Sequence, residues 1–220
     1  MDYSIEKYKC VSSTNTVLKE MTDAKAGTVV IAEEQTAGRG RMGRSFISEA
    51  GGLYMSVLFM PETVEEQLFI PILAAVAVHK ALSEYVKCSI KWPNDILVNG
   101  KKLCGILAEA QGRRVILGIG VNISSAPDYA VSLFQVSDEK VCADTLAKNI
   151  LNNVSDFEKK AEVIEYYREN CGMLGEKINV IANDKTYEAK AVDIAENGEL
   201  VIEENGVRKY INSGEVSVRR

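Results

Sequence analysis

The amino-acid sequence predicts an α+β domain followed by a small all-β barrel. Strand-like and helix-like segments alternate from the start of the chain to about residue 170, with no internal repeat and no low-complexity stretch. From residue 173 onward the segments are short, strand-like and separated by turn-forming pairs. The apolar content of 46% is enough for a buried core in a chain of 220 residues. We therefore expect two domains, residues 1–172 and residues 173–220.

The first part of the domain expected at residues 1–172 contains both helix and strand signals. Residues 12–15 are Ser and Thr followed by Asn, all helix N-cap formers, and they predict a helix over residues 16–21. Residues 29–33 and 53–60 favour strands. The Ala-rich segment at residues 72–85 has apolar side chains at helical spacing, so it predicts a buried helix.

The middle of the chain predicts antiparallel strands. Asn99 and Gly100 are the strongest short hairpin signal, because a type I′ turn needs positive φ at both central positions. Residues 138–170 carry apolar side chains at helical spacing and predict one or two amphipathic helices. The four strands expected before them cover residues 89–92, 96–98, 103–110 and 115–123.

The last 48 residues predict a barrel that packs on the first domain. Asn-Gly pairs at 197–198 and 205–206 punctuate this region, and a unit of this size is marginal by itself. The expected strands cover residues 177–182, 186–194, 200–203, 208–211 and 216–219.

Composition excludes several classes of enzyme. The chain has a single histidine, His79, which lies in an apolar stretch and is expected to be structural. Five cysteines are an odd number with no CxxC pair, so we expect free thiols. Neither a His-based zinc site nor a Ser-His-Asp or Cys-His arrangement is readily assembled. The remaining chemistry uses amides, Lys, Arg and carboxylates.

The chain is expected to be soluble and cytoplasmic, with no membrane partner. Its longest apolar runs, at residues 53–61 and 70–78, are shorter than the roughly 18 residues that span a bilayer. No basic and then apolar signal segment opens the sequence. The formal net charge is −5, which is mildly acidic.

The densest chemical signal is the sequence GRGRMGR at residues 38–44. Glycine lets backbone N–H groups approach an anion, and Arg binds carboxylate or phosphate oxygens bidentately, so the loop predicts an anion clamp. A solvated basic loop is the alternative. The GxGxxG spacing fails as a dinucleotide motif because another strand follows it instead of a helix. No GxxxxGK[ST] phosphate loop occurs.

A second signal is the sequence KWPND at residues 91–95. Pro93 cannot continue a central strand, so the chain breaks there and presents Asn94 and Asp95 from a corner. A carboxylate in this position can hold Mg²⁺ near a nucleotide. An ordinary Asn-Asp turn after an edge strand is the alternative.

Two further segments are weaker signals. Lys102 begins a strand just after the Asn-Gly hairpin and can act as a positioned cation, although a lysine there is usually solvated. Gly118 and Gly120 lie within an apolar strand, which indicates close approach by a ligand or, equally, packing against a helix. Asn122 follows them and can both donate and accept hydrogen bonds to a neutral polar ring.

In this order and spacing, the motifs resemble the biotin–protein ligase family, which attaches biotin to a lysine of biotin-dependent carboxylases. The resemblance runs from residue 12 to residue 122 and includes the small β-rich tail. It implies a catalytic domain like that of class II aminoacyl-tRNA synthetases, with a mixed, largely antiparallel sheet and flanking helices, and a C-terminal SH3-like barrel. The implied reaction makes biotinyl-5′-AMP and pyrophosphate from biotin and ATP with Mg²⁺. An acceptor lysine of a biotin carboxyl carrier domain then takes the biotinyl group.

The resemblance also implies roles for individual residues. Lys102 and Arg41 would be catalytic, and Asp95 would lie at the metal. Phe46 stands near the position of a family Trp that can stack on adenine. Biotin would be bound by Ser13, Thr14, Asn15, Gln35, Arg39, Gly40, Arg41, Lys102, Gly105, Gly118 and Asn122. ATP would be bound by Arg39, Arg41, Arg44, Phe46, Asn94, Lys102 and Arg219.

Three alternatives or departures accompany the resemblance. Lipoate–protein ligases and octanoyl transferases share the catalytic architecture, but GRGRMGR and KWPND are biotin-type patterns. A loop that only binds nucleic acid would need aromatic neighbours beyond Phe46 and a wider basic face. Twelve residues precede Ser13, too few for the DNA-binding domain of bifunctional members, so we expect a ligase with no DNA role. The pattern leaves the oligomeric state open, a homodimer included.

Overall fold

A seven-stranded mixed sheet forms the centre of the protein in this computed structural model, which describes residues 2–156, 159–182, 185–212 and 215–218. The strand order is β1-β2-β3-β7-β6-β5-β4, in which the β1–β2 pair is parallel and the other pairs are antiparallel. The strands are β1 (Ser4–Val11), β2 (Thr28–Gln35), β3 (Leu53–Phe59), β4 (Ser89–Lys91), β5 (Asp95–Val98), β6 (Lys101–Gln111) and β7 (Arg114–Val121).

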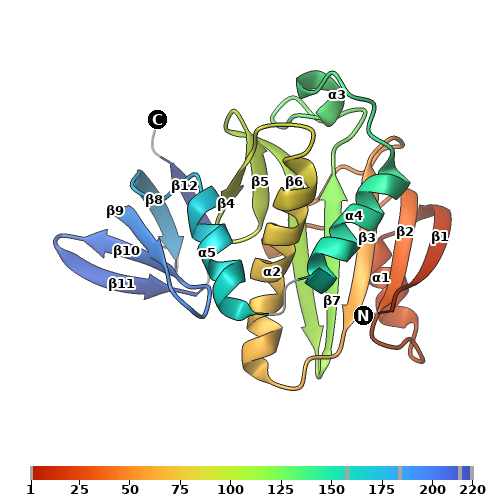
Figure 1. Cartoon of the computed structure of the whole chain (residues 1–220), viewed down its shortest axis with the longest axis horizontal. Helices are drawn as coiled ribbons and strands as arrows, with labels where there is room; N and C mark the ends of the chain where they lie inside the picture. Colours follow the sequence, from red (N-terminus) through yellow and green to blue (C-terminus); the bar gives the residue numbers. More distant parts are fainter. Residues whose placement is uncertain (1, 157–158, 183–184, 213–214, 219–220) are drawn as a thin grey trace.

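Helices cover both faces of this sheet (Figure 1). The helices α2 (Val64–Leu82), α4 (Ala143–Asp156) and α5 (Lys160–Asn170) pack together on one face over the larger apolar core. The short helix α1 (Thr14–Glu20) packs on the opposite face, where Leu18 joins Val30, Leu58 and Ile116 in a smaller core. The one-turn helix α3 (Leu133–Val136) lies between β7 and α4 in the sequence.

A second sheet of five antiparallel strands follows (Figure 1). Its strands have the order β11-β10-β9-β8-β12, and together with the first sheet they confirm the expected fold class. The expected division between residues 172 and 173 falls between α5 and β8, and we keep it as a proposal. The strands are β8 (Lys177–Ala182), β9 (Lys185–Ile194), β10 (Leu200–Glu204), β11 (Val207–Ile211) and β12 (Glu215–Val218).

Direct hydrogen bonds join α5 and the corner after β4 to the second sheet and its β9–β10 turn. The buried indole of Trp92 donates from Nε1 to the Gly198 carbonyl oxygen at 3.0 Å. Arg168 on α5 donates from Nε to the Ile194 carbonyl oxygen at 2.7 Å. These contacts fix the second sheet beside the corner that follows β4, so that β8 and β12 reach the cavity described below.

Most strands and helices agree with their sequence signals, but α2, β1 and the one-turn helix α3 do not, and the sequence signals place no helix at α3. Asn99 and Gly100 have φ values of 51° and 78°, as the type I′ hairpin requires. Helix α2 begins eight residues before the expected position 72, because the Thr63 hydroxyl accepts the Glu66 N–H at 3.1 Å and Pro71 lies inside the helix. Strand β1 is largely exposed and has no clear alternation, so no strand signal marks it in the sequence.

Three further features bear on the expectations from composition. Among the residues that the structure describes, no helix is both long and apolar enough to cross a membrane. All five cysteines have free thiols, as expected. His79 is buried between α2 and α5, where Nδ1 lies 3.1 Å from the Tyr166 hydroxyl and Nε2 lies 3.2 Å from the Cys88 carbonyl oxygen. It lies outside the cavity described below, in agreement with a structural role.

Candidate active site

The sequence motifs meet in one cavity of about 760 Å³ on the α1 face of the large sheet. Every site residue expected from the sequence lines it except Arg219, which lies outside the described residues. Ile181, Val216 and Ser217 from the second sheet also line it. The expected residues in the lining are Ser13, Thr14, Asn15, Gln35, Arg39, Gly40, Arg41, Arg44, Phe46, Asn94, Asp95, Lys102, Gly105, Gly118 and Asn122.

The register of three strands builds the floor of the cavity. Side chains alternate between the two faces of a strand, so residues that pair directly across the strands share a face. Gly118 pairs with Ser56 on β3 and Leu107 on β6, and Gly120 pairs with Tyr54 and Gly105. Three of these positions have no side chain, so the floor above β7 and β6 leaves room for side chains from other elements.

Close approach explains the glycines of the floor. A Cβ added to Gly118 would lie 2.4 Å from Asn15 Oδ1, and one added to Gly120 would lie 2.6 Å from the Phe46 ring. At Gly105 the nearest atom would be Cε of Lys102, at 2.7 Å. Packing of an α1 side chain thus accounts for Gly118, whereas the loop and the Lys102 stem occupy the space above Gly120 and Gly105.

The N-terminus of α1 supplies an uncharged polar wall. Ser13 is the N-cap residue, yet its side chain makes no capping hydrogen bond. Instead the Thr14 N–H donates to Gln35 Oε1 on β2 at 2.8 Å, and Gln35 Nε2 donates to Ser48 Oγ at 2.8 Å. The Gln35 amide is thereby held in one orientation at the end of β2.

A buried serine extends this wall. Ser56 is fully buried on β3, and its Oγ lies 2.7 Å from Thr14 Oγ1 and 2.6 Å from Asn15 Oδ1. Asn15 Nδ2 donates to Glu109 Oε2 at 2.7 Å. Sequence reasoning missed Ser56, Ser48 and Glu109. A serine in the otherwise apolar strand β3, and an acid on the same face of β6 as Gly105, were signals that could have found two of them.

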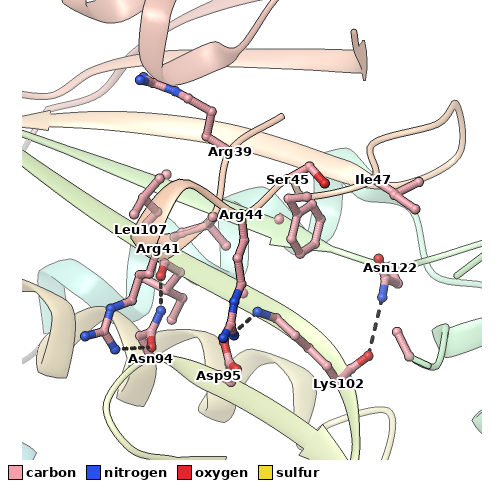
Figure 2. Close-up of a pocket in the computed structure, with 18 of the residues that line it drawn as sticks. Arg39, Arg41, Arg44, Ser45, Ile47, Asn94, Asp95, Lys102, Leu107 and Asn122 are labelled. Carbon is pink, nitrogen blue, oxygen red and sulfur yellow. Dashed lines mark hydrogen bonds and ion pairs between the residues drawn. The ribbon is translucent and has the colours of Figure 1, made fainter. Parts of the chain in front are cut away.

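The Gly/Arg loop lies over the cavity as a small hairpin. The Gly40 N–H donates to the Arg44 carbonyl oxygen at 2.7 Å, and the Phe46 N–H donates to the Gly38 carbonyl oxygen at 2.9 Å. Met42 at its tip has φ 53°, a left-handed conformation that a non-glycine residue adopts at some cost. Figure 2 shows the Arg39 side chain pointing away from those of Arg41 and Arg44.

Polar side chains of β5, of β6 and of the corner before β5 lie below the loop (Figure 2). Lys102 Nζ lies 2.7 Å from Asp95 Oδ1, and Arg41 NH1 donates to Asn94 Oδ1 at 3.2 Å. Asn94 Nδ2 in turn donates to the Ile106 carbonyl oxygen. The corner expected at Pro93 therefore does present Asn94 and Asp95 to the basic loop.

Asn122 closes the cavity at the opposite end (Figure 2). Its side chain is buried, and Nδ2 lies 3.4 Å from the Lys102 carbonyl oxygen and 3.2 Å from that of Val131. It thereby ties the start of β6 to the segment that leads into α3.

Phe46 is sandwiched between the floor and two neighbouring side chains. Its ring meets the Tyr54 ring edge-on, with centroids 6.4 Å apart, and Lys102 Nζ lies 5.7 Å from its centroid. The Tyr54 hydroxyl donates to the Glu49 carbonyl oxygen at 2.7 Å. Burial, with the charges of Glu49 and Glu34, raises the Tyr54 pKa to about 12, so this hydroxyl stays protonated at neutral pH.

The cavity is strongly cationic although the chain is acidic overall. Its described lining contains five cationic side chains, Arg39, Arg41, Arg44, Lys91 and Lys102, and one carboxylate, that of Asp95. This arrangement can bind an anionic group beside an uncharged polar or apolar body held by α1, β2 and the floor.

Comparisons with known proteins place the chain in a family. The chain matches the Biotin/lipoate A/B protein ligase family over residues 8–124 and the Biotin protein ligase C terminal domain over residues 173–219. It is 35% identical to Bifunctional ligase/repressor BirA of Bacillus subtilis, over 94% of this chain and 72% of that protein. The Biotin--[acetyl-CoA-carboxylase] ligase of Mycobacterium tuberculosis is 29% identical over 86% of this chain and 78% of its own length.

Comparisons with solved structures indicate the same family. The chain superimposes on the biotin protein ligase from Aquifex aeolicus in complex with biotin and ATP with a TM-score of 0.86, 32% identity and coverage of 99% of both chains. The biotin protein ligase of Leishmania major in complex with biotin gives a TM-score of 0.69 at 27% identity, over 94% of this chain and 97% of that one. The chain belongs to the Biotin/lipoate A/B protein ligase family, as a ligase of the biotin protein ligase type.

Proposed function

We propose that this ligase forms biotinyl-5′-AMP from biotin and ATP and then transfers the biotinyl group to a lysine of a biotin carboxyl carrier domain. The observation that carries the proposal is the pairing of a neutral polar wall with five cations around one cavity. A biotin ring is neutral and polar, its tail is apolar, and its carboxylate must meet an anionic phosphate. The described cavity offers a suitable partner for each of these parts.

In the first half-reaction, a carboxylate oxygen of biotin attacks the α-phosphorus of ATP. A carboxyl–phosphate bond forms, the bond from the α-phosphorus to the bridging oxygen breaks, and pyrophosphate leaves with the electron pair. Two anions must approach each other, so fixed cations lower the barrier more effectively than mobile solvent does. Lys102 and Arg41, which lie beside Asp95 and Asn94, are the groups we assign to that task.

The ends of the ligand would lie on opposite sides of these cations. Thr14, Asn15 and Gln35 would surround the biotin ring, because their hydrogen bonds, including those to the buried Ser56 behind them, already fix donors and acceptors there. Phe46 and Asn94 would lie near adenine and ribose. In the second half-reaction the acceptor amine attacks the carboxyl carbon of the mixed anhydride, AMP leaves, and the amine loses its proton.

Magnesium fits this site only as an ion that comes with ATP. Asp95 is the one carboxylate among the described lining residues, and no group of three potential metal ligands occurs in the described part of the chain. Mg²⁺ is commonly bound by one or two carboxylates plus substrate phosphates, so Asp95 would hold it there and the ion would neutralise phosphate charge.

Pyrophosphate release tests this proposal and its main competitor. The purified protein is mixed with Mg·ATP and biotin, lipoate or octanoate, without an acceptor. Release with biotin alone supports the proposal. Release with lipoate or octanoate alone would mean that the polar wall is built for another acid, and no release with any of them would contradict an adenylating function.

A further inference from the structure

Glu109 lies where the polar wall meets the basic loop. One of its oxygens, Oε2, accepts hydrogen bonds from two sides: from Asn15 Nδ2 at 2.7 Å and from Arg39 NH2 at 2.9 Å. Its side chain is 33% exposed, and that of Arg39 is 42% exposed. Glu109 belongs neither to the expected site residues nor to the cavity lining, and the reaction described above assigns it no role.

Strand register places Glu109 beside Asn15. On β6, Glu109 is two residues beyond Leu107, which pairs with Gly118, and both side chains lie on the α1 face of the sheet. Gly118 lies directly below Asn15 Oδ1. The glycine lets α1 come down to the sheet, and this approach brings the Asn15 amide within reach of Glu109.

The carboxylate determines which way the Asn15 amide points. An ionised carboxylate only accepts hydrogen bonds, so Asn15 must turn its NH₂ group to Glu109 and its oxygen to Ser56. Asn15 Oδ1 is indeed 2.6 Å from Ser56 Oγ. Without an acceptor at Glu109, the Asn15 amide would be free to flip, which would turn its NH₂ group to Ser56 and reverse the direction of that hydrogen bond.

The same carboxylate holds Arg39 apart from the other loop arginines. Figure 2 shows the Arg39 guanidinium on the far side of the loop from Arg41 and Arg44. The backbone of this loop is tied mainly by its own hairpin hydrogen bonds. Glu109 is therefore an anchor that joins the hairpin to β6 and to the Asn15 amide.

We propose that Glu109 is a positioning residue for the ligase reaction. Its carboxylate orients Asn15 and holds Arg39 in the ligand-free protein, until the carboxylate or phosphate of the ligand takes over the guanidinium. The part that concerns the ligand rests on the proposed function. The part that concerns the resting position of Arg39 does not, and it can be tested on the protein without substrate.

The first test compares amide hydrogen exchange in ligand-free wild type, Glu109→Gln and Glu33→Gln. Glu33 is an exposed acid on β2, on the opposite face of the strand from Glu34, so its variant makes the same charge change away from the loop. Exchange at the amides of Gly40 and Phe46 should be about twofold to fivefold faster in Glu109→Gln, as expected for loss of one partly exposed ion pair. It should be unaltered in Glu33→Gln.

An Arg39→Ala background sharpens this test. The ion pair is already absent there, so adding Glu109→Gln should leave the exchange rates unaltered. Equal exchange in wild type and Glu109→Gln would overturn the anchoring of Arg39. An effect of the same size in both backgrounds would also overturn it.

The second test measures pyrophosphate release against biotin concentration in Glu109→Gln and Glu109→Ala. The glutamine oxygen can still accept from Asn15, so KM for biotin should stay within about threefold of wild type. In Glu109→Ala it should rise about tenfold with little change in kcat, which corresponds to loss of one hydrogen bond.

Each outcome of the second test decides one point. The same rise in KM for the two variants, or a fall in kcat with unaltered KM, would overturn the positioning of Asn15. If the wild type releases no pyrophosphate, the proposed function fails, and with it the part of the inference that concerns the ligand. The hydrogen-exchange data still decide the part that concerns Arg39.

Discussion

The contact between Gly118 and Asn15 gives a sharp prediction about the polar wall. A Cβ at position 118 would lie 2.4 Å from Asn15 Oδ1, whereas ordinary contacts of this kind begin at 3.4 Å. The Gly118→Ala variant must therefore move the Asn15 amide by about 3.4 − 2.4 = 1.0 Å. A shift of that size breaks the hydrogen bonds from Asn15 to Glu109 and from Ser56 to Asn15, which are 2.7 Å and 2.6 Å long.

The expected loss follows from those two hydrogen bonds. One is to a carboxylate and one is neutral, so their combined contribution to the free energy of unfolding is about 2–4 kcal/mol. The lower entropy of the unfolded alanine chain offsets about 0.4–1 kcal/mol of this. We expect Gly118→Ala to lower the free energy of unfolding by about 1–3 kcal/mol in urea denaturation, and to weaken biotin binding by tenfold or more, as about 1.4 kcal/mol corresponds to tenfold.

A double-mutant cycle tests the cause. The three atoms nearest to the added Cβ all belong to the Asn15 side chain. In an Asn15→Ala background, Gly118→Ala should therefore have almost no further effect on the free energy of unfolding. If Gly118→Ala lowers the free energy of unfolding equally in the wild-type background and in the Asn15→Ala background, the clash with Asn15 is not the reason for the loss.

Three further predictions concern the cations and the single histidine. Lys102→Ala should slow biotin-dependent pyrophosphate release by about 100-fold to 1,000-fold, as expected when a donor to developing charge is removed. A fall in melting temperature without this kinetic loss would make Lys102 structural. Arg41→Ala should keep the fold, as measured by circular dichroism. It should release biotinyl-adenylate into solution faster, because a charge-assisted contact to the ligand is lost. An unaltered rate of release would contradict a role of Arg41 in holding the adenylate. Burial lowers the pKa of His79 below its usual 6.5, so its contribution to stability is complete above about pH 6.5 and falls as the pH decreases toward the lowered pKa. Urea denaturation at pH 7.5 and 5.5 should show this loss in wild type and a smaller one in His79→Gln; equal losses would assign the pH dependence to other groups.

Local sequence signals predicted the parts of the fold that depend on local chemistry. The Asn99-Gly100 hairpin follows from the need for positive φ, and the corner at Pro93 follows from the missing N–H of proline. The start of α2 could not be placed in the same way. Pro71 normally argues against a helix that continues through it, and the Thr63 cap lies eight residues before it.

The site was predictable where a motif supplies both residue type and spacing. The Gly/Arg loop, the corner with Asn94 and Asp95, and Lys102 come from three separate segments, and the structure brings them to one cavity. What the sequence could not supply is register. Glu109 can reach Asn15 only because the register of β6 and β7 places it close to Gly118, which lies below Asn15. The explanation of Gly118 by packing against a helix, and not by approach of a ligand, rests on the 2.4 Å distance from a Cβ at this position to Asn15 Oδ1.

Transfer of biotin to a carrier protein is the most direct test of the proposed ligase activity. The purified chain is incubated with Mg·ATP, biotin and an isolated biotin carboxyl carrier domain, and the intact mass of the carrier is measured, with a carrier that lacks the acceptor lysine as control. One biotinyl group should be added to the intact carrier, none to the control, and none without ATP. An unmodified carrier in the presence of biotin and ATP, or equal labelling of the control, would contradict that activity.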